Sequence, residues 1–146
     1  MSPAIHRDEL FVRAIEQHYP ALIRRLTAVL RDHETARDIA QEAYLRAYLA
    51  WDRFDGTDVR AWLYTIGLRL AFNERERRRR WHRLLGDRRS RFELEVASED
   101  LGLHSSLGSL RREHRAALLL NVVDGYTHAE IAAMLGVSSG TVASWV

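Results

Sequence analysis

The stretch "AEIAAMLGVSSGTV", residues 129–142, decides the fold, because its spacing is that of two short helices joined by a tight turn. Ile131 and Leu135 are apolar and one helical turn apart, and Ala132 is small where a second helix must cross closely. Gly136 stands at the turn, where a residue without a Cβ adopts a positive φ at little cost. The pattern predicts a helix-turn-helix, a motif that reads DNA but also occurs in plain helical hairpins.

The predicted second helix of this motif begins near Ser138, and the sequence stops at Val146. A helix of eight or nine residues without a C-cap is marginal in water, and Trp145 near its end would be a poorly supported ring. We therefore expect the chain to be a truncated form, or the ordered part, of a longer protein. The side chains that this helix would present to DNA are Ser138, Ser139, Thr141 and Ser144.

The rest of the chain also has helical spacing, and no segment alternates like a strand. Helices are expected at about 8–18, from Pro20 onward, at 34–50 with Asp32 as the cap, at 59–83 after Thr57 or Asp58, at 107–123 and at 128–135. Residues 86–102 mix glycine, serine and charge, which indicates a flexible linker. The sequence predicts an all-α fold of two small helical domains, residues 1–85 and 103–146, joined by that linker.

The composition narrows the functional class. The chain has 146 residues, no cysteine and a net charge of +2. It contains no apolar run of the roughly 20 residues that span a bilayer and no secretory signal pattern, so we expect a cytoplasmic, nucleoid-associated protein with no membrane insertion. All 22 basic residues are arginine. Nine of them lie between Arg75 and Arg91, which favours a polyanionic partner over a merely solvated helix face.

The third predicted helix has two contrasting sides. One side carries small residues suited to close packing, namely Ala36, Ile39, Ala40, Ala43, Ala47 and Ala50. The opposite side carries two leucines framed by polar and acidic groups: Asp38, Gln41, Glu42, Leu45 and Leu49. Either a neighbouring helix covers this second side, or it docks a basic partner helix. A catalytic carboxylate pair is disfavoured, because no nucleophile or metal ligand stands nearby.

The fourth predicted helix separates a core stripe from a strip suited to nucleic acid. Val59, Leu63, Ile66 and Leu70 are expected in the core. The adjoining strip holds Trp62, Thr65, Arg69, Asn73, Glu76 and Arg80, and Trp51 and Phe54 precede the helix. Aromatic rings stack on bases, guanidinium groups neutralise phosphates and amides read base edges, so the set favours binding of single-stranded nucleic acid. The alternative is that these aromatics are core residues.

Three segments, in this order, resemble the extracytoplasmic-function (ECF) group of bacterial sigma factors. They are "ETARDIAQEAYLRAYLAWDRFDG", "VRAWLYTIGLRLAFNERERRRR" and "HRAALLLNVVDGYTHAEIAAMLGVSSGTV". The resemblance covers most of the chain from about Phe11. It implies a region 2 helical domain, a region 4 helix-turn-helix domain, and a protein that brings core RNA polymerase to promoters. It also suggests an inhibitory anti-sigma partner.

The resemblance implies roles for particular residues. The set expected to bind the clamp of the polymerase β′ subunit is Asp38, Gln41, Glu42, Leu45 and Leu49. The set expected to read and melt the −10 element is Trp51, Phe54, Arg60, Trp62, Tyr64, Thr65, Arg69, Asn73, Arg77 and Arg80. The set expected to grip the −35 element is Arg115, Ser138, Ser139, Thr141 and Ser144.

The chain departs from the pattern of this group at several positions. Gly67 and Arg69 stand in a segment that usually reads Ile-Ala-Arg-Asn, so base preference at the −10 element is open. Asn73 replaces a common aspartate. Ala143 and Trp145 replace basic positions of the recognition helix, and no basic tail follows.

The sequence leaves three functional alternatives to an initiating sigma factor. A sigma-like protein that binds regulators without initiating is supported by the missing basic tail and opposed by the arginine run. An ordinary helix-turn-helix regulator leaves the acidic–apolar side of the third helix unexplained. An enzyme is the weakest reading, because no metal-ligand spacing or glycine-rich phosphate loop is present, so we expect no catalytic residues, metal or cofactor.

Overall fold

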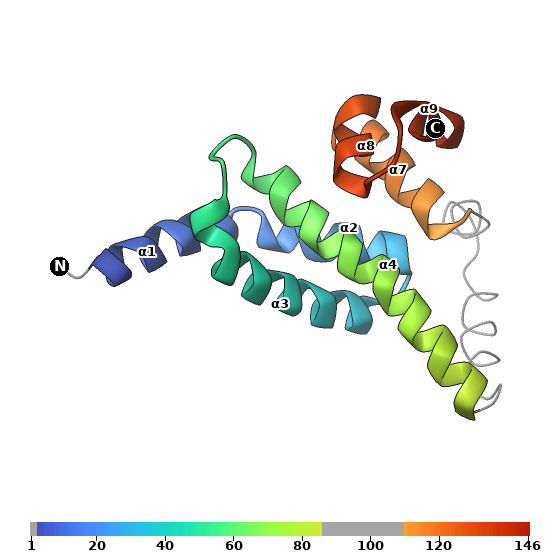
Figure 1. The fold of residues 1–146 in the computed structure, drawn as a ribbon, viewed down its shortest axis with the longest axis horizontal. Coiled ribbons are helices and arrows are strands. Elements are labelled where there is room, and N and C mark those ends of the chain that lie inside the picture. The colour runs from blue at the N-terminus through green and yellow to red at the C-terminus, as the bar shows by residue number, and fades with distance from the viewer. Residues whose placement is uncertain (1–2, 86–109) are drawn as a thin grey trace.

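A computed structural model describes residues 3–85 and 110–146, which are helical, with no strand among them. Its helices appear in Figure 1. They are α1 (Pro3–Glu16), α2 (Tyr19–Leu30), α3 (His33–Ala50), the short 3-10 helix η1 (Trp51–Arg53), α4 (Val59–Leu85), α7 (Arg112–Val122), α8 (His128–Leu135) and α9 (Ser139–Trp145). The linker predicted for residues 86–102 lies outside the described residues.

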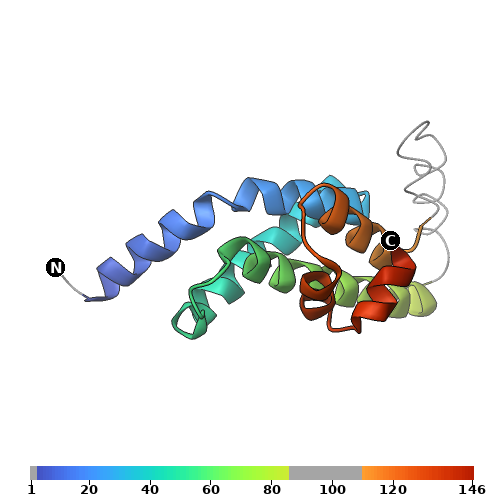
Figure 2. The same cartoon turned by 90° about the horizontal axis from the view of Figure 1, so that it is seen from above.

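Two groups of helices pack together. The N-terminal bundle comprises α1 to α4, with α2, α3 and α4 in mutual contact. The C-terminal unit comprises α7, α8 and α9. It lies against α2 and α4, through α7 and α8, while α3 lies on the other side of the bundle in Figure 1. The view from above in Figure 2 shows the same contact of the C-terminal unit with α2 and α4. We call the contact between the bundle and the unit the junction.

Capping residues explain where the helices begin. Asp32 caps α3, since its side chain accepts hydrogen bonds from the Glu34 and Thr35 amides at 3.2 and 3.4 Å. Asp58 caps α4 by accepting from the Ala61 amide at 3.0 Å. Pro20 lies in the first turn of α2, as predicted. The first helix differs from prediction, because it runs from Pro3 to Glu16 and not over 8–18.

The small-residue side of α3 is buried as predicted, apart from Ala50 at the end of the helix, which is half-buried. A close approach of α2 and α4 completes this core at Gly67, which is buried. A Cβ added there would lie 2.8 Å from a methyl carbon of Leu22, which is fully buried in α2. Gly67 therefore makes room for Leu22 of α2. This close approach explains why a glycine stands there although it lowers helix propensity.

The core stripe predicted for α4 is partly wrong. Leu63 is buried as expected, but Val59, Ile66 and Leu70 are only half-buried. The buried positions continue instead through Tyr64, Leu68 and Ala71. The reason is that α4 is covered from two directions, by α2 and α3 of the bundle and by α7 and α8 of the C-terminal unit.

The helix-turn-helix forms as the sequence predicts. Thr127 and Glu130 make a reciprocal capping box at the start of α8, and Gly136 has φ 71° at its end. Ser138 caps α9 by accepting from the Thr141 amide at 3.1 Å. Trp145 is half-buried and packs on His114 of α7 with ring centroids 5.2 Å apart, so the expectation of a poorly supported ring is wrong.

Candidate nucleic-acid and protein interfaces

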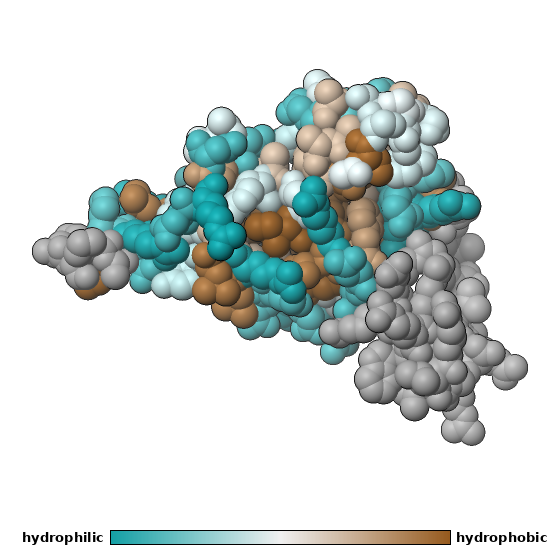
Figure 3. All heavy atoms as spheres, in the orientation of Figure 1, coloured by the Kyte–Doolittle hydropathy of each residue, from teal (hydrophilic) through white to brown (hydrophobic). Residues whose placement is uncertain are grey.

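The second side of α3 is open to solvent. Leu45 and Leu49 are 57% and 75% exposed, and no helix within residues 3–85 or 110–146 covers them. Asp38, Gln41 and Glu42 are exposed beside them. Figure 3 shows brown hydrophobic surface over the C-terminal part of α3, bordered by teal hydrophilic surface. We call these five residues the acidic–apolar face. Its geometry favours the docking interpretation over coverage by a neighbouring helix.

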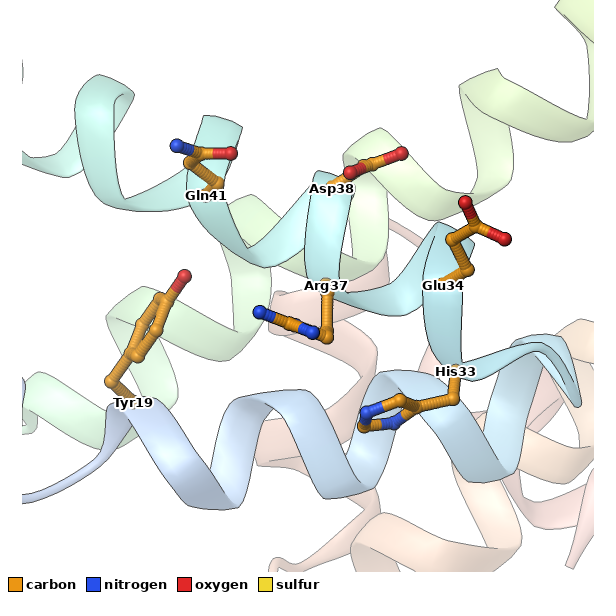
Figure 4. Close-up of a pocket in the computed structure, with 6 residues that line it drawn as sticks. All are labelled: Tyr19, His33, Glu34, Arg37, Asp38 and Gln41. Atoms are coloured by element: carbon orange, nitrogen blue, oxygen red, sulfur yellow. The ribbon is translucent and has the colours of Figure 1, made fainter.

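An open hollow of about 570 Å³ adjoins this face. Figure 4 shows Tyr19 from α2 on one side of it, with Arg37, Asp38 and Gln41 from α3 around it. Burial raises the pKa of Tyr19, with Arg37 acting in the opposite direction. The lining mixes both signs of charge and contains no nucleophile paired with a base, so the hollow suits a polar contact with a partner protein better than chemistry.

The aromatic residues before and within α4 form one cluster. The rings of Trp51 and Phe54 stack with centroids 5.4 Å apart and an interplanar angle of 14°. Trp62 tilts against Phe54 at 4.9 Å and against Trp51 at 6.0 Å. All three are half-buried, so each ring contributes to packing while part of it faces solvent. The core interpretation and the base-stacking interpretation therefore apply to different edges of the same rings.

The remaining strip of α4 is divided between solvent and the junction. Asn73 is exposed, and the half-buried Thr65 donates its hydroxyl to the Ala61 carbonyl at 2.7 Å. Arg69 is exposed along its length, but its guanidinium reaches the Met134 and Ala133 carbonyls at 3.4 and 3.5 Å. The side chains of Arg77 and Arg80 lie outside the described residues.

Two residues predicted to contact the −10 element are turned into the junction. Tyr64 is 1% exposed. Arg60 donates to the Tyr126 hydroxyl at 2.7 Å and to the Asp124 carbonyl at 2.9 Å, with its guanidinium 4.7 Å from the Tyr126 ring centroid. In this arrangement the Arg60 guanidinium is hydrogen-bonded to the C-terminal unit, and the Tyr64 ring is buried.

The predicted −35 residues separate in the same way. Ser138, Ser139 and Ser144 are exposed on α9, and Thr141 is half-buried. Ser144 donates its hydroxyl to the Thr141 carbonyl at 2.7 Å. Arg115, by contrast, is 5% exposed and donates to the Val29 carbonyl at 3.0 Å through Nε, and again through Nη2. The structure therefore groups the α9 residues and places Arg115 apart from them, inside the junction.

One buried ion pair of the junction lies outside every predicted contact set. Arg25 of α2 donates to both carboxylate oxygens of Asp124 at 2.8 and 2.9 Å, and their side chains are only 12% and 7% exposed. The loop that carries Asp124 is held by the Asp124 and Tyr126 amides, which donate to the Leu119 and Leu120 carbonyls. A buried two-oxygen ion pair has no local sequence signal, since its members are 99 residues apart.

Burial and charge at the junction shift three pKa values. A hydrogen bond to Tyr126 raises the pKa of Arg60. Burial raises the pKa of Tyr64, and the negative charge of Asp124 adds to that shift. Burial also raises the pKa of Tyr126, against a lowering contribution from its hydrogen bond with Arg60. These groups are therefore held as a cation and two neutral phenols.

Within the described part of the chain, no three histidine, aspartate or glutamate side chains gather as metal ligands do. No described helix combines the length and apolar content needed to cross a bilayer.

Comparisons with known families give two matches in chain order. The family described as Sigma-70 region 2 matches residues 14–81, and the family described as Sigma-70, region 4 matches residues 100–146. The first match contains the acidic–apolar face and most of α4, and the second contains the helix-turn-helix.

Individual relatives agree with these matches. The ECF RNA polymerase sigma factor SigL of Mycobacterium tuberculosis is 29% identical over 99% of this chain and 87% of its own length. The probable RNA polymerase sigma-C factor of Mycobacterium bovis is 32% identical over 94% of this chain and 76% of its own length. The ferric citrate uptake sigma factor FecI of Escherichia coli is 33% identical over 88% and 80%.

Two solved structures share the fold over nearly the whole chain. The sigma factor RpoE in complex with the anti-sigma factor NepR from Bartonella quintana matches with a TM-score of 0.70 and 25% identity, over 93% of this chain and 89% of that one. CnrH in complex with the cytosolic domain of CnrY matches with a TM-score of 0.64 and 26% identity, over 95% and 81%.

Proposed function

Because the chain belongs to the ECF group of the sigma-70 family of bacterial sigma factors, we propose that it binds core RNA polymerase through α3 and directs it to promoters through α4 and α9. One observation carries the assignment of surfaces. Leu45 and Leu49 stay exposed on α3, framed by carboxylates, although the opposite side of the helix is packed against the bundle.

The acidic–apolar face is the proposed contact with the β′ clamp of the polymerase. Burying Leu45 and Leu49 would remove two large side chains from water, worth roughly 1.5–3 kcal/mol each when fully buried. The exposed carboxylates of Asp38 and Glu42 then select a partner of opposite charge. Glu42 is now paired with Arg46 at 2.9 Å on the helix surface, a contact weak enough to exchange for a partner's cation.

The aromatic cluster and the exposed part of α4 are the proposed −10 surface. The partly exposed edges of Trp51, Phe54 and Trp62 support stacking on unpaired bases, each stack being worth about 1–3 kcal/mol. Asn73, together with Thr65, supplies polar groups next to them. Arg60, Tyr64 and Arg69, with the helical residues Arg77 and Arg80, complete the proposed set.

The exposed Ser138, Ser139 and Ser144, together with the half-buried Thr141, are the proposed −35 surface of α9, directed to duplex DNA. Arg115 belongs to this set only after it leaves the Val29 carbonyl. We also propose an anti-sigma factor as a regulatory partner, because one of the similar solved structures is a sigma factor in complex with an anti-sigma factor. The function assigns the chain no catalytic step of its own.

Reconstituted transcription tests this function. Purified core polymerase is expected to produce promoter-specific transcripts only when the chain is added. The double substitution Leu45→Ala and Leu49→Ala should reduce both polymerase binding and transcript yield at least tenfold. Leu10→Ala is the matched control, because Leu10 is a 47% exposed leucine of α1 outside the matched family region. Binding to an anti-sigma factor without binding to polymerase would support the non-initiating alternative.

A further inference from the structure

Under the proposed function, α9 reads DNA with short uncharged side chains. The helix runs Ser139–Trp145, contains no charged residue, and has only hydroxyl groups among its assigned contacts. A hydroxyl on a short side chain reaches a base edge only when the helix backbone lies close to that base in the groove. A long side chain can adjust to a displaced backbone, whereas a serine cannot. Readout through α9 therefore depends on how firmly the helix is held in one orientation.

The hydroxyl groups themselves are fixed relative to the helix. The Ser138 and Thr141 hydroxyls hydrogen-bond to each other at 2.8 Å, and Ser144 donates its hydroxyl to the Thr141 carbonyl at 2.7 Å. A side chain that is bonded to its own helix turns together with that helix. The direction in which these groups point is therefore set by the orientation of α9 as a whole.

Contacts along its length hold α9 against the C-terminal unit. At its start, the Val137 amide closes the turn by donating to the Ala132 carbonyl at 3.0 Å. Near its middle, Val142 is fully buried. At its end, Trp145 packs on the ring of His114 in α7, with centroids 5.2 Å apart and an interplanar angle of 33°. A turn and one buried valine would let the far end of the helix swing, so the ring contact fixes the remaining direction.

Trp145 lies on the packing side of α9. It follows the buried Val142 by three positions, which places both side chains on one face of the helix. A helix of 7 residues is too short to be stable alone in water, so tertiary contacts set its orientation. Trp145 and His114 are both half-buried, and an aromatic pair prefers particular ring geometries. Their contact therefore restricts the angle of α9 as well as its distance from α7.

We propose that Trp145, through its contact with His114, is a positioning residue of the −35 surface. The inference rests on the proposed function, which directs α9 to duplex DNA. Trp145 touches no base in this assignment. It holds the far end of α9 against α7, so that the serine and threonine hydroxyls reach the base edges together. Specificity at this helix then depends on an aromatic contact inside the protein and not on a charge directed to the phosphates.

Binding to two kinds of DNA separates positioning from general attraction. The specific probe is a duplex that core polymerase with the wild-type chain enriches from a random library, and the non-specific probe is a random-sequence duplex of equal length. Trp145→Ala and His114→Ala should each weaken binding of the polymerase complex to the specific probe about tenfold, as expected for the loss of one base contact. Trp145→Ala should leave binding to random sequence and its salt dependence unchanged, because that attraction comes from charge.

Conservative variants test whether the ring contact is the cause. Trp145→Phe and His114→Phe each keep an aromatic ring at the contact, so specific binding should stay within about twofold of wild type. Combining Trp145→Ala with His114→Ala should weaken binding no more than either change alone, because both remove the same contact. Val122→Ala is the control, because Val122 is 68% exposed at the other end of α7 and outside the proposed contact sets. Additive losses, or a tenfold loss in both phenylalanine variants, would overturn the proposal.

The indole signals of a proton–nitrogen correlation NMR spectrum report the contact without DNA. The chain has 4 tryptophans, and the signal that disappears in Trp145→Phe belongs to Trp145. His114→Ala should shift this signal more than the other indole signals, and an unshifted signal would overturn the contact. Unchanged specific binding in both alanine variants, or an equal loss on both probes, at wild-type helix content by circular dichroism, would overturn the positioning role. Failure of the wild-type complex to enrich any sequence beyond core polymerase alone would instead reject the proposed function.

Discussion

Arg25 and Asp124 face each other across the junction with two hydrogen bonds of 2.8 and 2.9 Å, one to each carboxylate oxygen. Neither residue belongs to a predicted contact set, and both side chains are almost removed from water. The pair therefore contributes to the arrangement of the two halves in a way that can be measured apart from DNA binding.

A double-mutant cycle should give a coupling energy of about 1–3 kcal/mol for Arg25→Ala and Asp124→Ala. Each single substitution is expected to lower the free energy of unfolding by more than the coupling energy, because it leaves the other charge buried without its partner. Denaturant unfolding of the four chains measures the free energies. The Arg7 and Asp52 pair is the exposed comparison, and its coupling should be much smaller and disappear in salt. Equal coupling energies in both pairs would contradict a stabilising effect of burial on the Arg25–Asp124 pair.

Arg115→Ala should lower the free energy of unfolding by roughly 2–3 kcal/mol, because charge-assisted hydrogen bonds to the buried Val29 carbonyl are lost. Arg115→Lys should recover little of this, since an ammonium group lacks the planar fork that also reaches the Leu110 carbonyl at 2.9 Å. A DNA contact alone would leave unfolding unchanged and alter only duplex affinity. Measuring both quantities on the same variants separates the two roles.

Gly67→Ala should not gain the roughly 1 kcal/mol of helix stability that this substitution usually brings. The added methyl would lie 2.8 Å from the buried Leu22 side chain, and overpacking of that kind costs about 1–3 kcal/mol. Gly140→Ala in α9 is the control, because its nearest neighbour is the Ser138 hydroxyl at 4.0 Å. Thermal unfolding should show Gly140→Ala as the more stable variant. A clear gain from Gly67→Ala would mean that Leu22 moves aside freely.

The folded chain should lose stability above about pH 10, the ordinary pKa of tyrosine. Burial raises the pKa values of Tyr64 and Tyr126, so their neutral forms are favoured in the folded chain. Their contribution is complete below the unfolded pKa and is lost as the pH rises through the folded one. Tyrosinate absorbance follows the titration.

In the Asp124→Asn variant, the pKa values of Tyr64 and Tyr126 should fall toward the ordinary value, because the negative charge of Asp124, which raises both, is removed. Tyr19 is an internal control. Its pKa is raised by burial within the bundle, beside Arg37 and Tyr44, and it should not move. A uniform shift of all the tyrosines would indicate general unfolding and not the loss of the Asp124 charge.

Local signals gave the helices but not the junction. Asp32 and Pro20 are short-range cues that name a helix start, and both act as predicted. The segment 128–135 was predicted with its observed bounds from its apolar spacing and from Gly136, and the structure adds a capping box of Thr127 and Glu130 at its start. Such cues work because caps and turns are satisfied by residues within four positions of one another.

The face of α4 that carries Tyr64 could not be read from periodicity. The sequence pattern assumes one buried side, whereas this helix is covered by both halves of the molecule. Arg25 is one of 22 arginines, and its partner is 99 residues away, so nothing near it in the sequence marks it. Arg115 was assigned to DNA by resemblance, a role that remains a prediction, and its burial depends on a docking that only the three-dimensional arrangement reveals.

The separation of Arg25 and Asp124 along the chain has a consequence during protein synthesis. Ribosomes add about 5–20 residues per second and N-terminal domains fold first. The 99 residues from Arg25 to Asp124 therefore take roughly 5 to 20 s to make. Once residue 85 has been added, the nascent bundle has α2 and α4 but not yet the complete C-terminal unit that lies against them. Every newly made molecule thus passes through a stage in which the surface of α2 and α4 is exposed, before the junction first forms.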